Sequence, residues 1–107
     1  MKRLGPTVAA LLLAAPLLAE DAPKRSAAFE TYCIVCHGED GKANTEEGKK
    51  KGARDLTNAK WQATVSDSRL VGSITRGRDK MPAFGRKLTA EQIKALVAEV
   101  RTLAQSH

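Results

Sequence analysis

Cys33-Ile34-Val35-Cys36-His37 is the stretch on which the organisation of this 107-residue chain depends. It places two thiols and an imidazole within five consecutive residues, which is the pattern of a covalent haem-attachment site. In that chemistry each cysteine sulfur adds to a vinyl group of the porphyrin, and Nε2 of the adjacent histidine binds the iron. The motif therefore predicts one haem c, attached through Cys33 and Cys36, with His37 as an axial ligand of the iron.

Two other kinds of site use the same residue types. A structural zinc site normally has four protein ligands, whereas the chain contains no further cysteine and only one other histidine, His107. A dithiol redox motif of the thioredoxin kind lies at a helix N-terminus within a βαβ unit, and no such alternation is visible here. Haem attachment is the prediction that we carry forward, and the dithiol is the remaining alternative.

The N-terminus has the layout of a secretory signal peptide over residues 1–19. A positively charged start precedes an apolar run from residue 8 to residue 19 that only Pro16 interrupts. The run is short for a membrane span, and it ends on a small residue, Ala19. We predict cleavage near Ala19 and one exported domain over residues 20–107. The alternative is an uncleaved segment that anchors the chain in the membrane.

The exported domain is expected to be moderately basic. Loss of Lys2 and Arg3 with the signal peptide would leave 16 of the 18 basic residues against 12 acidic ones, a formal balance of +4. A basic domain suits an acidic protein partner, a membrane surface or nucleic acid. An exported chain without a recognisable nucleic-acid module argues against nucleic acid. The aromatic residues are few, namely Phe29, Tyr32, Trp61 and Phe84, so a bound macrocycle would add apolar mass to a small core.

Helical periodicity predicts two helices before Met81. The first covers residues 24–35 and ends near Gly38. Residues 39–54 are polar and rich in glycine, so we expect a loop with at most a short helical turn. The second helix begins at Ser66, which can cap it, and ends at Gly77.

The last helix has the clearest start in the sequence. Thr89 and Gln92 form a capping box, in which each side chain bonds a main-chain N–H of the other residue. We expect this helix to cross the first near Phe29 and to have no chemistry of its own. The apolar stripe that should face the core consists of Ile93, Leu96, Val97, Val100, Leu103 and Ala104. Because no run has the period of a strand, the domain should be mainly α-helical.

Met81 is the best candidate for the second axial ligand. It is the only methionine after the signal peptide, and the following Pro82 favours an extended backbone from which a thioether can point inward. A methionine is more often a core side chain that fills a gap, but a haem motif upstream favours ligation. Lys80, His107 and an open coordination position are the alternatives.

Five further side chains are candidates for the haem pocket. Trp61 is either a core residue or a partner whose indole N–H donates to a haem propionate. The apolar residues expected to pack on the haem are Leu56, Leu70, Ile74 and Phe84.

The ordered motifs resemble those of the small class I c-type cytochromes of bacteria, over essentially the whole chain after the signal peptide. The residues that carry the resemblance are Cys33-Ile34-Val35-Cys36-His37-Gly38, Arg76-Gly77, Met81-Pro82-Ala83-Phe84-Gly85 and Leu88-Thr89-Ala90-Glu91-Gln92-Ile93. The resemblance implies an all-α class I cytochrome c fold, with three to four short helices wrapped around one covalently bound haem. It also implies His37 and Met81 as axial ligands and a periplasmic location.

One departure concerns the orientation of His37. Many relatives have a proline soon after the motif whose carbonyl accepts the histidine Nδ1–H, and this chain has no proline between His37 and Met81. Some other acceptor must fix the imidazole ring, and the sequence does not identify it.

An iron with two protein ligands can change oxidation state without binding substrate. We therefore expect a one-electron carrier rather than an enzyme. The carrier should be a monomer that acts between periplasmic or membrane-bound redox partners. The alternatives are a haem subunit of a larger oxidoreductase and a protein that binds gas or peroxide after a labile Met81 leaves. We expect an acidic docking surface on the partner, since basic residues flank Met81 in the sequence. These are Arg76, Arg78, Lys80, Arg86 and Lys87.

Overall fold

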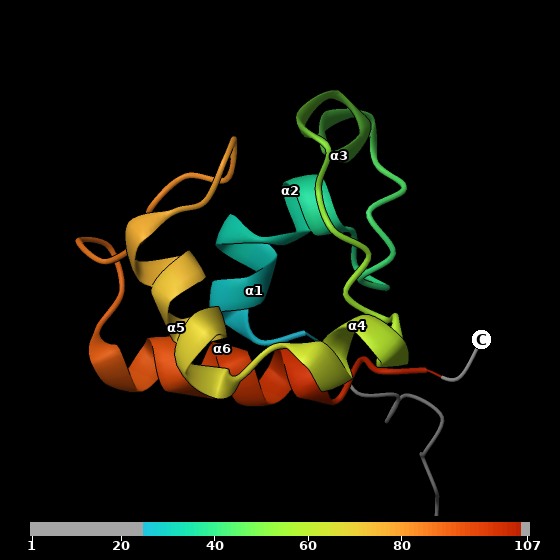
Figure 1. The fold of residues 1–107 in the computed structure, drawn as a ribbon. Helices are drawn as coiled ribbons and strands as arrows, with labels where there is room; N and C mark the ends of the chain where they lie inside the picture. The colour runs from blue at the N-terminus through green and yellow to red at the C-terminus, as the bar shows by residue number, and fades with distance from the viewer. Residues whose placement is uncertain (1–24, 106–107) are drawn as a thin grey trace, which may run out of the picture.

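Six helices make up the domain in the computed structural model, which describes residues 25–105 (Figure 1). They are α1 (Ala27–Tyr32), α2 (Ile34–His37), α3 (Glu46–Lys51), α4 (Ala59–Thr64), α5 (Asp67–Arg76) and α6 (Ala90–Arg101). The described residues form no named strand, so the all-α fold class is confirmed. There are more helices than the three to four expected, because α2, α3 and α4 are single turns of four to six residues. The predicted signal peptide and His107 lie outside the described residues.

The first predicted helix is present as two short helices that meet at Cys33. The Ser26 hydroxyl accepts the N–H of Phe29 at 3.1 Å, so α1 begins at Ala27 and not at residue 24. The His37 N–H donates to the Cys33 carbonyl at 2.9 Å, which continues the helical path through the motif. Cys33 and His37 are four residues apart and therefore project from the same face. The stop at Gly38 is confirmed by its φ of +81°, which favours glycine.

The α3 helix packs on the backbone of the haem motif. Thr45 caps α3 by accepting the N–H of Gly48 at 2.8 Å, and the same hydroxyl lies 2.8 Å from the Val35 carbonyl oxygen and 3.0 Å from that of Cys36. Gly48 is buried, and a Cβ at this position would overlap the Cys36 carbonyl oxygen. The sequence predicted a loop over residues 39–54 with at most a short helical turn. In the structure that turn is the α3 helix, which lies in close contact with α2.

The α4 helix was not expected. Its N-cap is Asn58, whose side-chain oxygen accepts the N–H of Trp61 at 2.9 Å. Gln62 is buried, and its amide donates to the carbonyls of Leu56 at 2.7 Å and Val100 at 2.8 Å. These bonds connect α4 to the preceding loop and to α6.

The predictions for α5 and α6 are confirmed at their capped ends. Ser66 accepts the N–H of Arg69 at 3.0 Å, and Gly77 ends α5 with a φ of +82°. Both bonds of the capping box at Thr89 are present.

The expected stripe of α6 faces the core except at its end. Ile93, Leu96, Val97, Val100 and Leu103 are buried, whereas Ala104, which follows the end of α6 at Arg101, is exposed. The α1 helix packs across α6, as predicted, and Phe29 of α1 is only 1% exposed (Figure 1).

In the part of the chain that the structure describes, none of the helices has both the length and the apolar character needed to cross a membrane.

Candidate functional site

A cavity of about 420 Å³ opens on one face of the molecule. All nine residues predicted for the haem site line it, although they come from five separate segments. They are Cys33, Cys36, His37, Leu56, Trp61, Leu70, Ile74, Met81 and Phe84. Its size is within the range of small-molecule and cofactor sites.

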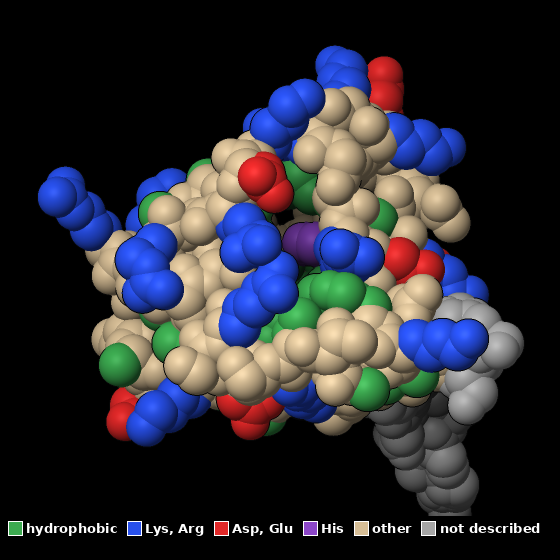
Figure 2. All heavy atoms as spheres, in the orientation of Figure 1, with side chains coloured by type: hydrophobic (Ala, Val, Ile, Leu, Met, Phe, Trp, Pro, Cys, Tyr) green, Lys and Arg blue, Asp and Glu red, His purple; other side chains and the backbone are tan. Residues whose placement is uncertain are grey.

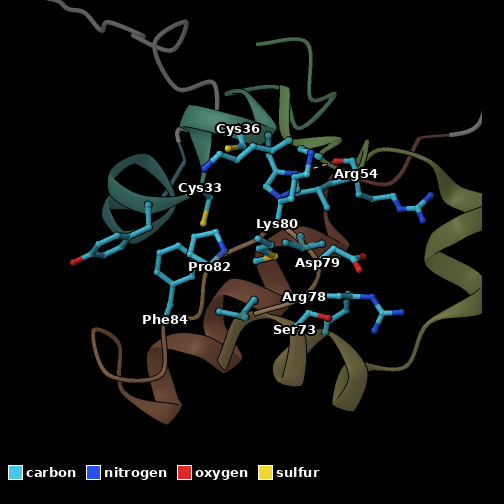
Figure 3. A pocket seen from close by; sticks show the side chains of 18 of the residues that line it. Cys33, Cys36, Arg54, Ser73, Arg78, Asp79, Lys80, Pro82 and Phe84 are labelled. Carbon is cyan, nitrogen blue, oxygen red and sulfur yellow. Dashed lines mark hydrogen bonds between the residues drawn. The ribbon is translucent and has the colours of Figure 1, made fainter. Parts of the chain in front are cut away.

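The two cysteines lie on the α1–α2 side of the cavity (Figure 3). No disulfide joins them. Burial, and to a lesser degree the negative charge of Glu99, raises the pKa of Cys33 to about 11, so this thiol is neutral at physiological pH. Cys33 and Cys36 both line the cavity.

His37 has a fixed ring orientation. Its Nδ1 lies 2.9 Å from the carbonyl oxygen of Arg54. A carbonyl can only accept, so Nδ1 carries the hydrogen and Nε2 retains its lone pair. Burial lowers the pKa of His37, and the bond to the Arg54 carbonyl partly opposes this effect. The acceptor that the sequence could not identify is thus the main-chain carbonyl of Arg54. The type of side chain at position 54 does not indicate this role, because every residue has a main-chain carbonyl.

Met81 is positioned by a tight hairpin between Arg78 and Met81, which follows the C-terminal end of α5. The Arg78 N–H donates to the Met81 carbonyl at 3.1 Å, and the Met81 N–H donates to the Arg78 carbonyl at 2.8 Å. After Met81 the chain is attached again, because the Phe84 N–H donates to the Ile74 carbonyl at 2.8 Å. Met81 is half-buried and packs against the core.

The cavity walls are aromatic and aliphatic. The rings of Tyr32 and Phe84 lie 5.5 Å apart at 54°, and the Lys87 ammonium lies 5.8 Å and 5.9 Å from their centroids. On the other side, the guanidinium carbon of Arg54 lies 4.8 Å from the centroid of the Trp61 ring.

Basic side chains surround the open side of the cavity (Figure 2). Of the five predicted around Met81, Arg78 and Lys80 line it, whereas Arg76, Arg86 and Lys87 do not. The Arg76 guanidinium instead lies against Gly72 of its own helix. The prediction missed other basic residues of the lining, namely Lys51, Arg54 and Arg69, because they are distant from Met81 in the sequence.

The residues present fit a covalently bound haem. Two thiols lie on one side, a neutral imidazole has Nε2 available, a thioether comes from another segment, and apolar side chains form the walls. A small helical domain with these features is a c-type cytochrome domain.

Comparisons with known proteins agree with this class. Residues 20–98 match the family described as cytochrome C oxidase, cbb3-type, subunit III. The chain is 41% identical over 91 residues to the cbb3-type cytochrome c oxidase subunit FixP of Azorhizobium caulinodans, covering 84% of this chain and 30% of FixP. It is 34% identical over 97 residues to cytochrome c6 of Rippkaea orientalis, covering 91% of this chain and 84% of cytochrome c6. The solved structure of the KustC0563 c-type cytochrome superposes with a TM-score of 0.69 at 40% identity, covering 73% and 94% of the two chains.

The chain belongs to this family of c-type cytochromes, and haem c is therefore its cofactor. The resemblance to small class I cytochromes is confirmed, and the dithiol alternative is set aside. The chain spans less than a third of the length of FixP but most of the length of cytochrome c6.

Proposed function

We propose that this chain is a one-electron carrier in which Cys33 and Cys36 bind haem c covalently. His37 and Met81 are the axial ligands of the iron in this proposal. The observation that supports it is that an imidazole with a free Nε2 and a thioether line the same apolar cavity as the two thiols. A haem-stained denaturing gel tests the attachment: the stain should migrate with the polypeptide in the wild type. Stain that separates from the wild-type band would contradict covalent attachment.

In this proposal each ligand residue has a distinct role. The haem supplies a reversible change between ferric and ferrous iron. The Arg54 carbonyl keeps the His37 ring in the tautomer that presents Nε2. The Met81 thioether is a soft ligand that favours ferrous iron and so raises the reduction potential. The apolar walls, with Leu56, Leu70, Ile74 and Phe84 as packing residues, limit the access of water to the iron.

A carrier differs from a gas-binding protein in the stability of its sixth ligand. If Met81 occupies that position, ferrous wild-type protein should not bind carbon monoxide under native conditions. Met81→Ala should bind it, because the variant opens the position. Rapid binding by the wild type would favour the alternative in which Met81 is labile.

We also propose that residues 1–19 are a signal peptide and that residues 20–107 form the periplasmic domain. The apolar run and the small residue at Ala19 support this. The intact mass of the haem-loaded protein from a periplasmic fraction should correspond to residues 20–107 plus one haem. A mass that includes residues 1–19 would support an uncleaved anchor.

A second candidate is a haem subunit of a larger oxidase. The observation in its favour is the match to a family described as an oxidase subunit. Native mass measured after gentle solubilisation separates the two: a free carrier has the mass of one chain, whereas a subunit co-purifies with other polypeptides.

Finally, we propose that an acidic redox partner docks on the basic side of the cavity. Small electron-transfer interfaces associate quickly when charges are complementary, and screening acts over about 8 Å at physiological ionic strength. The rate with an acidic partner should fall as salt rises. Reversal of Arg78 and of Arg86 to glutamate should reduce it further, since Arg78 is exposed and lines the cavity and Arg86 is exposed beside the Met81 segment. Lys42→Glu is the control, with the same charge change on the loop after α2. A rate that is indifferent to salt, to Arg78→Glu and to Arg86→Glu would contradict this docking surface.

A further inference from the structure

The chain holds the hydrogen-bond acceptor of His37 without a proline. Nδ1 of His37 lies 2.9 Å from the carbonyl oxygen of Arg54, and no proline occurs between His37 and Met81. A proline ring would restrict the backbone of the acceptor segment. Arg54 is instead exposed, and a Cβ on the nearby Gly52 would meet no atom within 4 Å. The position of this carbonyl therefore depends on contacts made by other parts of the chain.

Two main-chain hydrogen bonds attach the segment that contains Arg54. Before it, the Ala53 N–H donates to the Gly48 carbonyl of α3 at 2.8 Å. After it, the Leu56 N–H donates to the Gly41 carbonyl at 2.7 Å. The first attachment is only as firm as the position of α3, which is six residues long. A helix this short is marginal in isolation, so tertiary contacts have to hold it.

The Thr45 hydroxyl joins α3 to the haem motif. Its oxygen accepts the N–H of Gly48 at 2.8 Å and so caps the helix. The same oxygen lies 2.8 Å from the carbonyl oxygen of Val35 and 3.0 Å from that of Cys36. A hydroxyl has one hydrogen to donate, which these two carbonyls share. One side-chain group therefore serves both as the cap of α3 and as its attachment to the motif.

These bonds form a closed path around the proposed iron ligand. The path leads from the main chain of Cys36 through the Thr45 hydroxyl into α3. From the Gly48 carbonyl it continues to the segment before Arg54, whose own carbonyl returns to the His37 ring. The two ends of the path are neighbours in the sequence, so a movement of α3 changes the distance between the acceptor and Nδ1.

We propose, building on the haem site proposed above, that Thr45 is a positioning residue for His37. Its hydroxyl holds α3 against the haem motif, and α3 in turn holds the Arg54 carbonyl on Nδ1. A hydrogen bond from Nδ1–H to a carbonyl makes the imidazole a more basic ligand, which stabilises ferric iron. Thr45 thereby supplies, through a short helix, the support that a proline gives to the acceptor in many relatives.

Loss of the Thr45 hydroxyl should weaken the Nδ1 bond without removing a ligand of the iron. Thr45→Val keeps the shape of the side chain but can neither cap α3 nor donate to the motif. The Nδ1 proton of the ferrous protein should then exchange with solvent roughly 5- to 30-fold faster than in the wild type. The midpoint potential should rise, because the imidazole becomes a weaker donor, whereas loss of the Met81 thioether would lower it.

The experiment measures Nδ1 proton exchange by NMR and the midpoint potential at fixed pH for the haem-loaded wild type and four variants. Beside Thr45→Val, Thr45→Ser retains the hydroxyl and should keep both wild-type values. Thr45→Asp provides an acceptor for the cap but, when ionised, has no hydrogen to donate to the motif, so its Nδ1 proton should also exchange faster. This variant keeps the test decisive if Thr45→Val does not fold. Thr89→Val removes the equivalent cap from α6, outside the cavity lining, and should leave exchange and potential unchanged.

Wild-type exchange or a wild-type potential in Thr45→Val would overturn the proposal, as would wild-type exchange in Thr45→Asp. A Thr45→Ser protein that behaves like Thr45→Val would also overturn it, and so would equal changes in Thr89→Val, because any weakened helix cap would then have the same effect. A lower potential in Thr45→Val would assign the change to Met81 and count against the proposal.

The haem-stained gel of the wild type separates these results from failure of the proposed function. If haem is attached and neither exchange nor potential responds to Thr45→Val, only the role of Thr45 is wrong. If haem is not attached, both proposals are wrong.

Discussion

Replacement of Gly48 by alanine tests whether α3 packs directly on the backbone of the haem motif. Gly48 lies inside α3 with a φ in the ordinary helical range, so the substitution requires no unusual backbone conformation. A Cβ there would overlap the carbonyl oxygen of Cys36 and lie 3.1 Å from its carbonyl carbon and 2.9 Å from the Thr45 hydroxyl. The main chain of Cys36 cannot rotate away as a flexible side chain can, so α3 would have to move.

The two contributions to stability have opposite signs. Helix propensity favours alanine over glycine by about 0.8 to 1.0 kcal/mol. Insertion of a methyl group into a well-packed interface typically costs about 1 to 3 kcal/mol, and a collision with main-chain atoms belongs at the upper end of that range. We therefore expect Gly48→Ala to lower the free energy of unfolding by about 1 to 2 kcal/mol. For a domain of this size, the melting temperature should fall by roughly 5 to 15 °C.

The assay is urea unfolding of the haem-loaded proteins, followed by far-UV circular dichroism and by haem absorbance. Lys50→Ala is the matched control, because Lys50 is exposed in the same helix and its replacement should change stability by less than about 0.5 kcal/mol. If Gly48→Ala is as stable as the wild type or more stable, the helix propensity of alanine outweighs the steric cost. The inferred close contact between α3 and the main chain of Cys36 would then be refuted.

Three other predictions concern stability. Ala43 has a φ of +62°, which is costly for any residue with a Cβ. Ala43→Gly should therefore raise the free energy of unfolding by about 0.5 to 1 kcal/mol in the same urea assay. A lower free energy of unfolding in this variant would contradict the prediction. Thr89→Ala removes the hydroxyl that caps α6 and should cost about 1 kcal/mol, whereas an unchanged melting temperature would show that the cap contributes little. A Cys33→Ala, Cys36→Ala variant made without haem should be largely unfolded by circular dichroism, because the core is small without the cofactor; a cooperative melt with native helicity would refute this.

The sequence allowed prediction of the elements whose limits depend on local side chains. The capping box at Thr89 and the Ser66 cap specify the starts of α6 and α5 through bonds to residues three positions away. The α4 helix was missed because it is only six residues long and has no apolar periodicity. Its Asn58 cap was the available signal.

The candidate site was predicted in its chemical groups but not in its supporting contacts. The motif and the lone methionine suffice to select Cys33, Cys36, His37 and Met81, because each choice depends on residue type. The partner of His37 is a main-chain carbonyl, and every residue has one, so only the fold selects Arg54. The convergence of arginines from three segments likewise depends on how α5 and the loop after α3 approach each other.

The most direct test of the central claim is a spectroelectrochemical titration of Met81→Ala beside the wild type, with Lys80→Ala as the control for the neighbouring alternative ligand. Haem should remain attached to Met81→Ala through the two cysteines. Its midpoint potential should fall, because the thioether that favours ferrous iron is lost, while Lys80→Ala should retain the spectrum and potential of the wild type. A Met81→Ala protein with the spectrum and potential of the wild type would assign the sixth ligand elsewhere and contradict the account.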